Sequence, residues 1–123
     1  MIEILRDRDA SAAAAFGADV SRPVLCYTAR QDGKPLCSCT YGIEDGLVAI
    51  YELVGRDGGV VVELGDGVLR AVLNSADLFG IRGAVCSNEG LDRLLTGLGF
   101  KEESTSDGKK RYFLDLEGYF TEK

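Results

Sequence analysis

Histidine is absent from the 123-residue sequence, and the marks of several protein classes are missing with it. No two of the four cysteines have the Cys-x-x-Cys spacing, so the usual ligands of a structural zinc site are lacking. Apolar runs such as 12–16 and 60–62 are far shorter than the ~20 residues that cross a bilayer. Residues 1–6 carry charge and enter patterned sequence at once, unlike a secretory signal. These absences predict a soluble, cytoplasmic protein with no metal site and no membrane partner.

Concentrated positive charge is also missing, because the net charge is -6 and the sequence pI is about 4.6. The densest basic run, 109–111, follows an Asp-Gly turn, where it is expected to solvate a strand end. An acidic chain repels phosphate backbones and anionic lipid surfaces at the range where approach is steered. The composition therefore predicts that the protein has no nucleic-acid partner.

What is present suits one packed core, since 123 residues with 46% hydrophobic content are typical of a single domain spanning 1–123. Without a leader, the four cysteines are interpreted as reduced thiols. If Asp32-Gly33 is a two-residue hairpin turn, Cys26 lies opposite Cys39, with Cys37 on the same face. Three small buried hydrophobes are the favoured interpretation of this cluster, and a metal site is the alternative.

Periodicity predicts an α/β chain. Strands are expected at 1–6, 24–30, 35–41, 47–54, 81–86, 100–104 and 111–116. Helices are expected at 10–16, with Asp7 or Asp9 as the cap, at 66–79 and at 88–98. The central helix has apolar residues at helical spacing, namely Val68, Leu69, Val72, Leu73, Ala76 and Phe79. Residues 55–64 are ambiguous, because a turn signal at 56–59 precedes the β-branched run 60–62.

The stretch Gly65 to Ile81, which begins Gly-Asp-Gly-Val-Leu-Arg-Ala-Val-Leu, is similar to the signature helix of the GNAT (Gcn5-related) N-acetyltransferase superfamily. Cys-Ser-Asn at 86–88, Leu-Leu at 94–95 and Leu-Gly-Phe-Lys at 98–101 continue the resemblance. It covers 65–101 and implies a divergent, short member. The expected fold is a GNAT-like mixed sheet flanked by helices, whose central strands diverge near Val54 and Cys86.

The resemblance implies an acetyl-coenzyme A site, in which backbone N–H groups at a helix N-terminus bind the pyrophosphate. The residues it assigns to the cofactor are Leu53, Val54, Gly65, Asp66, Gly67 and Asn88. The family usually has Gln or Arg, two variable residues, Gly, one variable residue, then Gly or Ala. Counted back from Gly65, only the last position agrees.

Two features of this stretch bear on the predicted phosphate site. A carboxylate of Glu63 or Asp66 beside a pyrophosphate would repel it by about 1 to 4 kcal/mol. Asp66 has the alternative role of capping its own helix. Arg56 with the glycine pair 58–59 offers a different loop for the phosphate.

The catalytic position also departs from the family, in which many members use a tyrosine to protonate the departing thiolate. Leu95 stands at the matching position, where it cannot donate a proton and is expected to fill the core. Glu52 is the predicted general base, and a solvated or salt-bridged carboxylate is the alternative. Tyr51 and Tyr41 are the candidate substitutes for the acid.

Three functions follow as hypotheses. The first is a GNAT-like protein with a weakened or lost acetyl-coenzyme A site. The second is an active N-acetyltransferase that moves acetyl to a small-molecule or peptide amine. The third is a non-catalytic interaction module or homodimer, in which a sheet edge or the aromatic pair Tyr119–Phe120 meets a partner.

Overall fold

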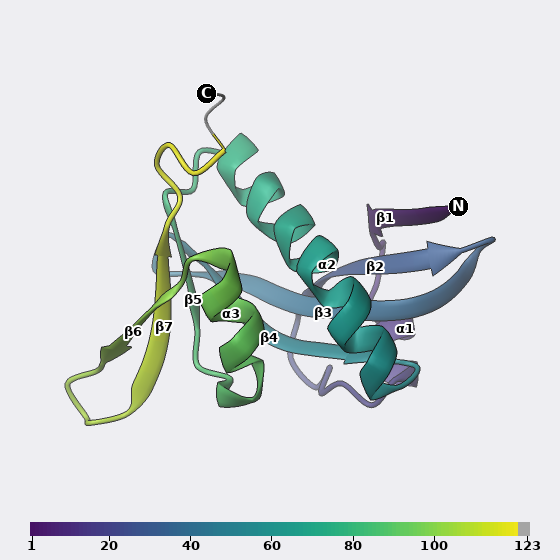
Figure 1. Ribbon diagram of the computed structural model, residues 1–123, viewed down its shortest axis with the longest axis horizontal. Helices are drawn as coiled ribbons and strands as arrows, with labels where there is room; N and C mark the ends of the chain where they lie inside the picture. The colour runs from purple at the N-terminus through teal and green to yellow at the C-terminus, as the bar shows by residue number, and fades with distance from the viewer. Residues whose placement is uncertain (121–123) are drawn as a thin grey trace.

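The computed structural model describes residues 1–120 and shows a sheet with helices on both of its faces (Figure 1). The strands are β1 (Ile2–Arg6), β2 (Leu25–Gln31), β3 (Lys34–Glu44), β4 (Leu47–Gly55), β5 (Gly83–Cys86), β6 (Lys101–Ser104) and β7 (Lys110–Asp115). The helices are α1 (Ser11–Ala15), α2 (Gly58–Leu78), the 3-10 turn η1 (Glu89–Leu91) and α3 (Asp92–Leu98). All seven predicted strands are present, with ends within a few residues of those expected.

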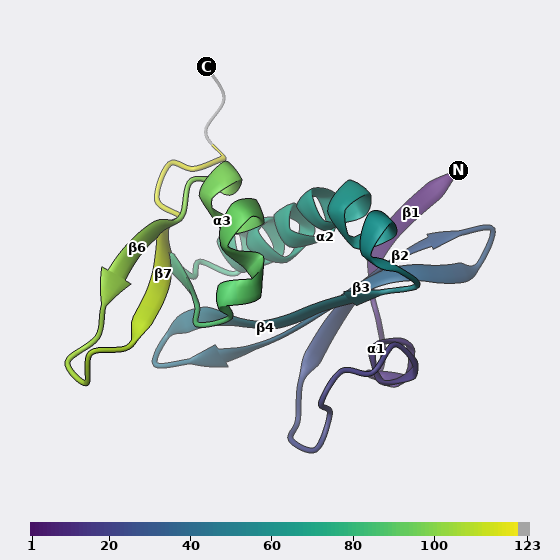
Figure 2. The ribbon, with the colours of Figure 1, turned by 60° about the horizontal axis from the view of Figure 1, so that its bottom comes forward.

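The seven strands form one mixed sheet in the order β1-β2-β3-β4-β5-β7-β6. Neighbouring strands are antiparallel except β4 and β5, which are parallel and joined by the crossover helix α2. Figure 2 shows α2 and α3 on one face of the sheet and the short α1 on the other. This arrangement confirms the predicted mixed sheet flanked by helices.

The core lies between the sheet and α2, where five of the six apolar residues predicted for this helix are buried. The sixth, Phe79, is wrong as a core residue, because it follows the last helical residue and is 77% exposed. Tyr119 and Phe120 pack on the same core, and the Tyr119 hydroxyl donates to the Leu98 carbonyl. The aromatic pair is thus seated on its own domain.

Helix α2 begins at Gly58, two turns before the predicted start at Asp66. Asp57 is extended and its carboxylate accepts the Val60 N–H at 2.9 Å, which makes it the N-cap. The β-branched run 60–62 favoured a strand or loop by propensity, but Val60 and Val61 pack against the core from the helix. The ambiguous stretch is therefore the end of β4 and the first turns of α2.

The β2–β3 hairpin has the predicted turn, in which Asp32 and Gly33 both have positive φ. Its predicted register is wrong by one residue, because a bulge between the pairs Arg30–Pro35 and Ala29–Cys37 leaves Leu36 unpaired. Cys26 consequently lies opposite Thr40 and packs with α1 on the opposite face from Cys37 and Cys39. The expected three-thiol cluster does not form, and no group suited to a metal ion occurs within residues 1–120.

All four cysteines are free and buried, as small hydrophobes are. Burial raises the pKa of each thiol, that of Cys37 to about 11. No helix within residues 1–120 is long and apolar enough to span a bilayer.

The two aspartates before α1 have different roles from the predicted cap. Asp9 accepts the backbone N–H of Ser11, whereas the cap residue of α1 is Ala10. Asp7 instead binds Arg30 at 2.7 Å and the buried Thr28 hydroxyl. These bonds attach the connection between β1 and α1 to two side chains of β2.

The position of the α2 N-cap makes a testable prediction. Replacing Asp57 by Ala should lower the free energy of unfolding by about 1 kcal/mol, because the Val60 N–H loses its acceptor. Replacing Asp66 by Ala, at the start that the sequence suggested, removes only an exposed ion pair with Arg70, worth about 0.3 to 0.5 kcal/mol. Urea unfolding followed by circular dichroism measures both. A larger loss for Asp66→Ala than for Asp57→Ala would contradict this helix start.

Candidate functional site

The candidate site lies where β4 and β5 separate. Their parallel pairing runs from Val48 with Ala84 to Ile50 with Cys86 and then ends. Tyr51 is an extra residue in β4, because β3 pairs Tyr41 with Ile50 and Thr40 with Glu52. From this bulge to Gly55, β4 has no strand partner on its β5 side within residues 1–120. The predicted divergence is therefore present, and it begins earlier in β4 than Val54.

Asn88 spans the opening of this divergence. Its side-chain amide donates to the Tyr51 carbonyl at 3.1 Å, and its carbonyl oxygen accepts the Gly90 N–H at 3.0 Å. The first bond satisfies one backbone group of β4 that β5 no longer reaches. Asn88 is thus at the predicted position between the two strands, where it also caps η1.

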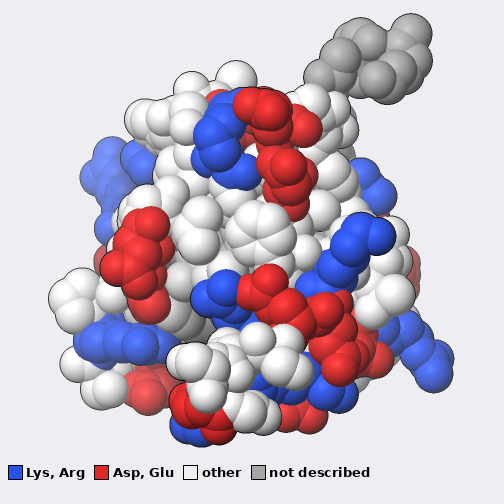
Figure 3. Space-filling model, turned by 90° about the vertical axis from the view of Figure 1, so that its left-hand side faces the viewer, with Lys and Arg blue, Asp and Glu red and all other residues white. Residues whose placement is uncertain are grey.

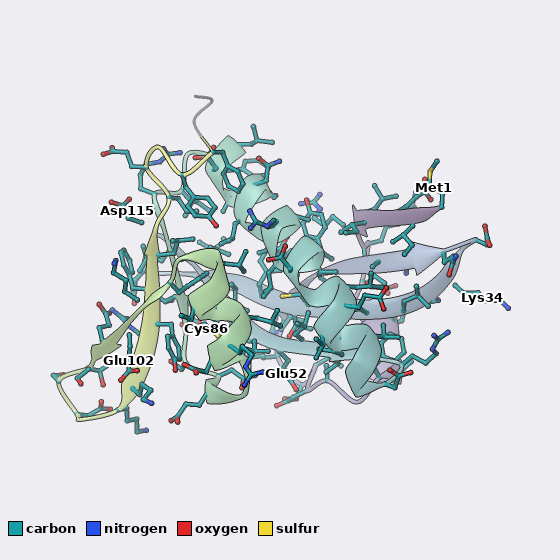
Figure 4. All side chains as sticks on the ribbon, viewed as in Figure 1. Met1, Lys34, Glu52, Cys86, Glu102 and Asp115 are labelled. Atoms are coloured by element: carbon teal, nitrogen blue, oxygen red, sulfur yellow. The ribbon has the colours of Figure 1, made fainter. Side chains whose placement is uncertain are left out.

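A cleft of about 440 Å³ adjoins the divergence on the face of the sheet opposite α2. Its walls come from the segment after α1, from β4, from the end of β5 and from the start of β7. The lining includes the charged residues Asp19, Arg22, Glu44, Glu52 and Arg111. Figure 4 labels Glu52 on β4 and Cys86 at the end of β5.

Glu52, the predicted base, is half-buried in this cleft. One of its carboxylate oxygens accepts the Asp19 backbone N–H at 2.7 Å. No lysine or arginine lies within 4.0 Å of it among the described residues, so the alternative of a salt-bridged carboxylate does not hold there. A second carboxylate oxygen remains for a ligand in the cleft.

Tyr51 and Tyr41, the two candidate acids, lie on opposite sides of the sheet. Tyr51 lines the cleft, its hydroxyl donates to Glu44, and the Arg22 guanidinium lies 3.8 Å from its ring centre. Burial, together with the hydrogen bond to Glu44, raises the pKa of Tyr51. Tyr41 is buried beneath α2, where burial raises its pKa to about 12. Only Tyr51 is placed to meet a ligand in the cleft.

Leu95 has no exposed surface and belongs to the main core, as predicted for an apolar residue at the family's tyrosine position. Tyr112 is the tyrosine closest to Leu95 along the sequence. It is also buried, and its hydroxyl donates a hydrogen bond to Asp92 of α3. That hydrogen bond raises the pKa of Tyr112 to about 12. Neither residue lines the cleft.

Gly65 and Gly67 lie inside α2, so the prediction of a helix N-terminus at these residues is wrong. Helical N–H groups beyond the first turn bond to carbonyls four residues earlier and are not available to a phosphate. Gly65 allows close packing instead, because a Cβ there would lie 2.7 Å from Leu53 Cδ2 and 3.1 Å from Leu94 Cδ1. Asp66 is exposed and pairs with Arg70 at 2.9 Å.

The junction between β4 and α2 contains Arg56 and the glycine pair 58–59, which the sequence offered as a second possible phosphate loop. Counted from Arg56, the family's phosphate pattern has Arg first and Gly59 fourth, whereas Val61 occupies the last position. A Cβ built on Gly58 meets nothing within 4 Å, and one on Gly59 meets only the Asp57 carboxylate at 3.3 Å. The space beside the Cα atoms of both glycines is therefore not filled by core packing.

Asp57 opposes an anion at the same helix start. Its carboxylate occupies the Val60 N–H, one of the first-turn donors, and adds a negative charge. Arg56 lies 3.9 Å from Asp57, and both side chains are well exposed, so the pair is weak. The helix start thus presents Arg56 and first-turn backbone N–H groups together with one carboxylate that opposes an anion.

Sequence reasoning missed Asp19, Arg22, Glu44 and Arg111 as lining residues. Asp19 and Arg22 lie in the irregular segment between α1 and β2, to which the pattern assigned no element. Arg111 pairs with Glu103 across the β6–β7 hairpin. The basic run 109–111 marked this hairpin, but nothing in its composition showed that it faces the cleft.

No protein-family model matches the chain, and no curated protein matches it. Solved structures do match. The ribosomal-protein-S18-alanine N-acetyltransferase from Escherichia coli has a TM-score of 0.70, 16% identity and coverage of 94% of each chain. An IAA acetyltransferase from Bacillus cereus has a TM-score of 0.73 and 15% identity over 94% of this chain and 99% of its own.

Further neighbours extend this result. A PaiA N-acetyltransferase from Thermoplasma acidophilum, solved with coenzyme A, has a TM-score of 0.63 and 16% identity over 75% of this chain and 60% of its own. Other neighbours are GNAT-family acetyltransferases, and one is a KacTA–DNA complex with a TM-score of 0.61 and 18% identity. At these identities the likeness shows the fold, which is that of the GNAT N-acetyltransferases.

Gly42 offers a test of the cleft geometry. A Cβ at this position would lie 2.6 Å from the Tyr51 hydroxyl oxygen, so Gly42→Ala should push the ring off Glu44. The pKa of Tyr51 should then fall toward its ordinary value, because the hydrogen bond to Glu44 that helps to raise it is lost. NMR titration of ring-labelled tyrosine measures this, with Tyr51→Phe assigning the signal. Because the clash involves the end of a movable side chain, stability should change little; an unchanged Tyr51 pKa would contradict the placement.

Proposed function

We propose that this protein is a divergent GNAT-superfamily member that retains a weakened site for a coenzyme A thioester. The observation that carries the proposal is the β4–α2 junction, where Arg56 and the open glycines 58–59 meet the carboxylate of Asp57. The fold shared with acetyltransferases, one of them holding coenzyme A, supports the choice of ligand.

Arg56 and the first-turn N–H groups of α2 would hold the pyrophosphate. Leu53 and Val54, on the part of β4 without a β5 partner, would line the pantetheine arm, and Asn88 would meet it from the other side. Asp57 would weaken this binding, since like charges a few ångström apart at an exposed site repel by about 1 kcal/mol. The predicted cradle thus moves from Gly65, Asp66 and Gly67 to the true start of the helix.

Acetyl-coenzyme A, when bound, supplies a thioester that an amine can attack. For that reaction Glu52 would accept the proton that the amine loses as its C–N bond forms and the C–S bond breaks. Leu95 cannot return a proton to the thiolate, and Tyr51 is engaged by Glu44. We therefore infer that any transfer is slow and that the acceptor is a small-molecule or peptide amine.

The surface over β6 and β7 carries acidic and basic side chains intermixed, without a continuous basic area (Figure 3). This distribution and the net charge of -6 support the proposal that the protein works without nucleic acid. The DNA in the KacTA complex belongs to that neighbour. Salt-dependent binding of duplex DNA to this protein would count against the proposal.

Isothermal titration of coenzyme A tests the site through a paired substitution. Asp57→Ser keeps a capping oxygen while removing the charge, so it should bind coenzyme A about five- to tenfold more tightly than the wild type. Arg56→Ala should bind more weakly by a similar factor. Asp66→Ser and Arg70→Ala, a turn or more along the same helix, are the matched controls and should change nothing. If neither the wild type nor Asp57→Ser shows a heat of binding at millimolar coenzyme A, the proposed site is rejected.

The role of Glu52 is tested separately by acyl transfer. Release of free thiol from acetyl-coenzyme A with a panel of amines should fall about 100-fold in Glu52→Gln, because a positioned base is lost. Coenzyme A binding should stay unchanged in that variant, as should transfer in Glu63→Gln, an exposed control on α2. Equal rates for Glu52→Gln and wild type would show that solvent takes the proton.

A further inference from the structure

An apolar surface that residues 1–120 leave exposed lies at the C-terminal end of α2, away from the cleft described above. Four large side chains contribute to it: Leu78 and Phe79 from the helix end, Leu25 from β2 and Ile43 from β3. Their exposed fractions are 78%, 77%, 41% and 51%. We call these four residues, with the half-buried Tyr27 and Ile81 between them, the α2-end patch.

The α2-end patch combines a protrusion with a hollow. Leu78 and Phe79 project from the helix end, where Phe79 is the residue that helical periodicity had assigned to the core. Beside Phe79 is a groove of about 290 Å³, floored by Tyr41 and Val48 and bordered by Leu25, Ile43 and Ile81. A second hollow between Tyr27 and Leu78 continues it.

Charge is sparse around the groove, because Arg6 is the only charged residue that lines it within residues 1–120. The cores of protein–protein interfaces are depleted of charged groups in this way, since each charge that is covered must lose its water. A charged partner would find Arg6 as its only complementary charge among the described residues that line the groove. The composition therefore favours an apolar partner.

The exposed area matches what a small dimer needs. At roughly 100 to 200 Å² for a fully exposed apolar side chain, the four exposed fractions amount to about 400 Å². Standard interfaces at the low end bury about 600 Å² per partner, of which about 65% is apolar in homodimers. A ligand confined to the groove would leave Leu78, on the outer side of Phe79, uncovered.

We propose that the α2-end patch is the contact surface of a homodimer, in which Phe79 of each copy enters the groove of the other. A protrusion and a hollow on the same surface satisfy the rule that a twofold interface is self-complementary. The contact differs from the sheet edge and the Tyr119–Phe120 pair that the sequence had suggested. It is also independent of coenzyme A binding, so the two proposals stand or fall separately.

Sedimentation equilibrium across a concentration series tests the dimer with full-length protein. The wild type should associate with a Kd in the micromolar range, as expected for a small interface. Phe79→Glu should weaken association at least tenfold, and Leu78→Glu should do so as well. Val62→Glu is the matched control, because Val62 is 73% exposed on the same helix and lies outside the patch, and it should associate like the wild type.

Each other outcome overturns the proposal. A wild type that stays monomeric at several hundred micromolar excludes the dimer. A wild-type dimer that survives both Phe79→Glu and Leu78→Glu places the contact elsewhere. Both substituted residues are largely exposed, so circular dichroism should show native folding for each variant. If the wild type is a monomer that binds an apolar dye, and Phe79→Glu loses this binding, the groove is a site for a small apolar ligand and not a dimer contact.

Discussion

The parallel pairing of β4 with β5 covers only three residue pairs, and the bulge at Tyr51 follows directly after the last of them. Backbone groups that lose a strand partner near the middle of a sheet need another one, because an unpaired buried N–H or carbonyl is unfavourable. The Asn88 amide donates to the Tyr51 carbonyl, and the rest of β4 has no strand partner on its β5 side within residues 1–120. The cleft, the placement of Glu52 and the proposed path of the coenzyme arm all depend on this early separation.

The elements with strong local signals could be predicted from sequence. The Asp-Gly turns at 32–33 and 45–46 have positive φ angles at both residues, as such pairs allow, and they fix the order of three consecutive strands. The apolar stripe from Val68 to Ala76 identified the crossover helix and the face it buries. Of the candidate site, the sequence placed Glu52 and Asn88 beside the strand divergence, because both follow from the position of a strand end.

The sequence-based predictions that were wrong or undecided have separate physical causes. Propensity opposed a helix at Val60 to Val62, yet packing against the sheet and the Asp57 cap outweighed a few tenths of a kilocalorie per residue. The single unpaired Leu36 shifted the β2–β3 register, and no composition signal distinguishes a bulge from a regular hairpin. Arg22 and Asp19 reach the cleft through an irregular segment, whose path depends on contacts with distant residues such as Glu52.

Helix α2 has 21 residues and is therefore about 31 Å long, with the proposed coenzyme site at one end and the proposed dimer contact at the other. Allosteric coupling between two sites requires an element with two discrete positions that both ligands bias. Gly65 holds the middle of the helix so close to Leu53 and Leu94 that even a methyl group would collide there. A shift of α2 would therefore have to displace the Leu53 and Leu94 side chains, so any coupling through this helix between cofactor occupancy and subunit association would carry that repacking cost.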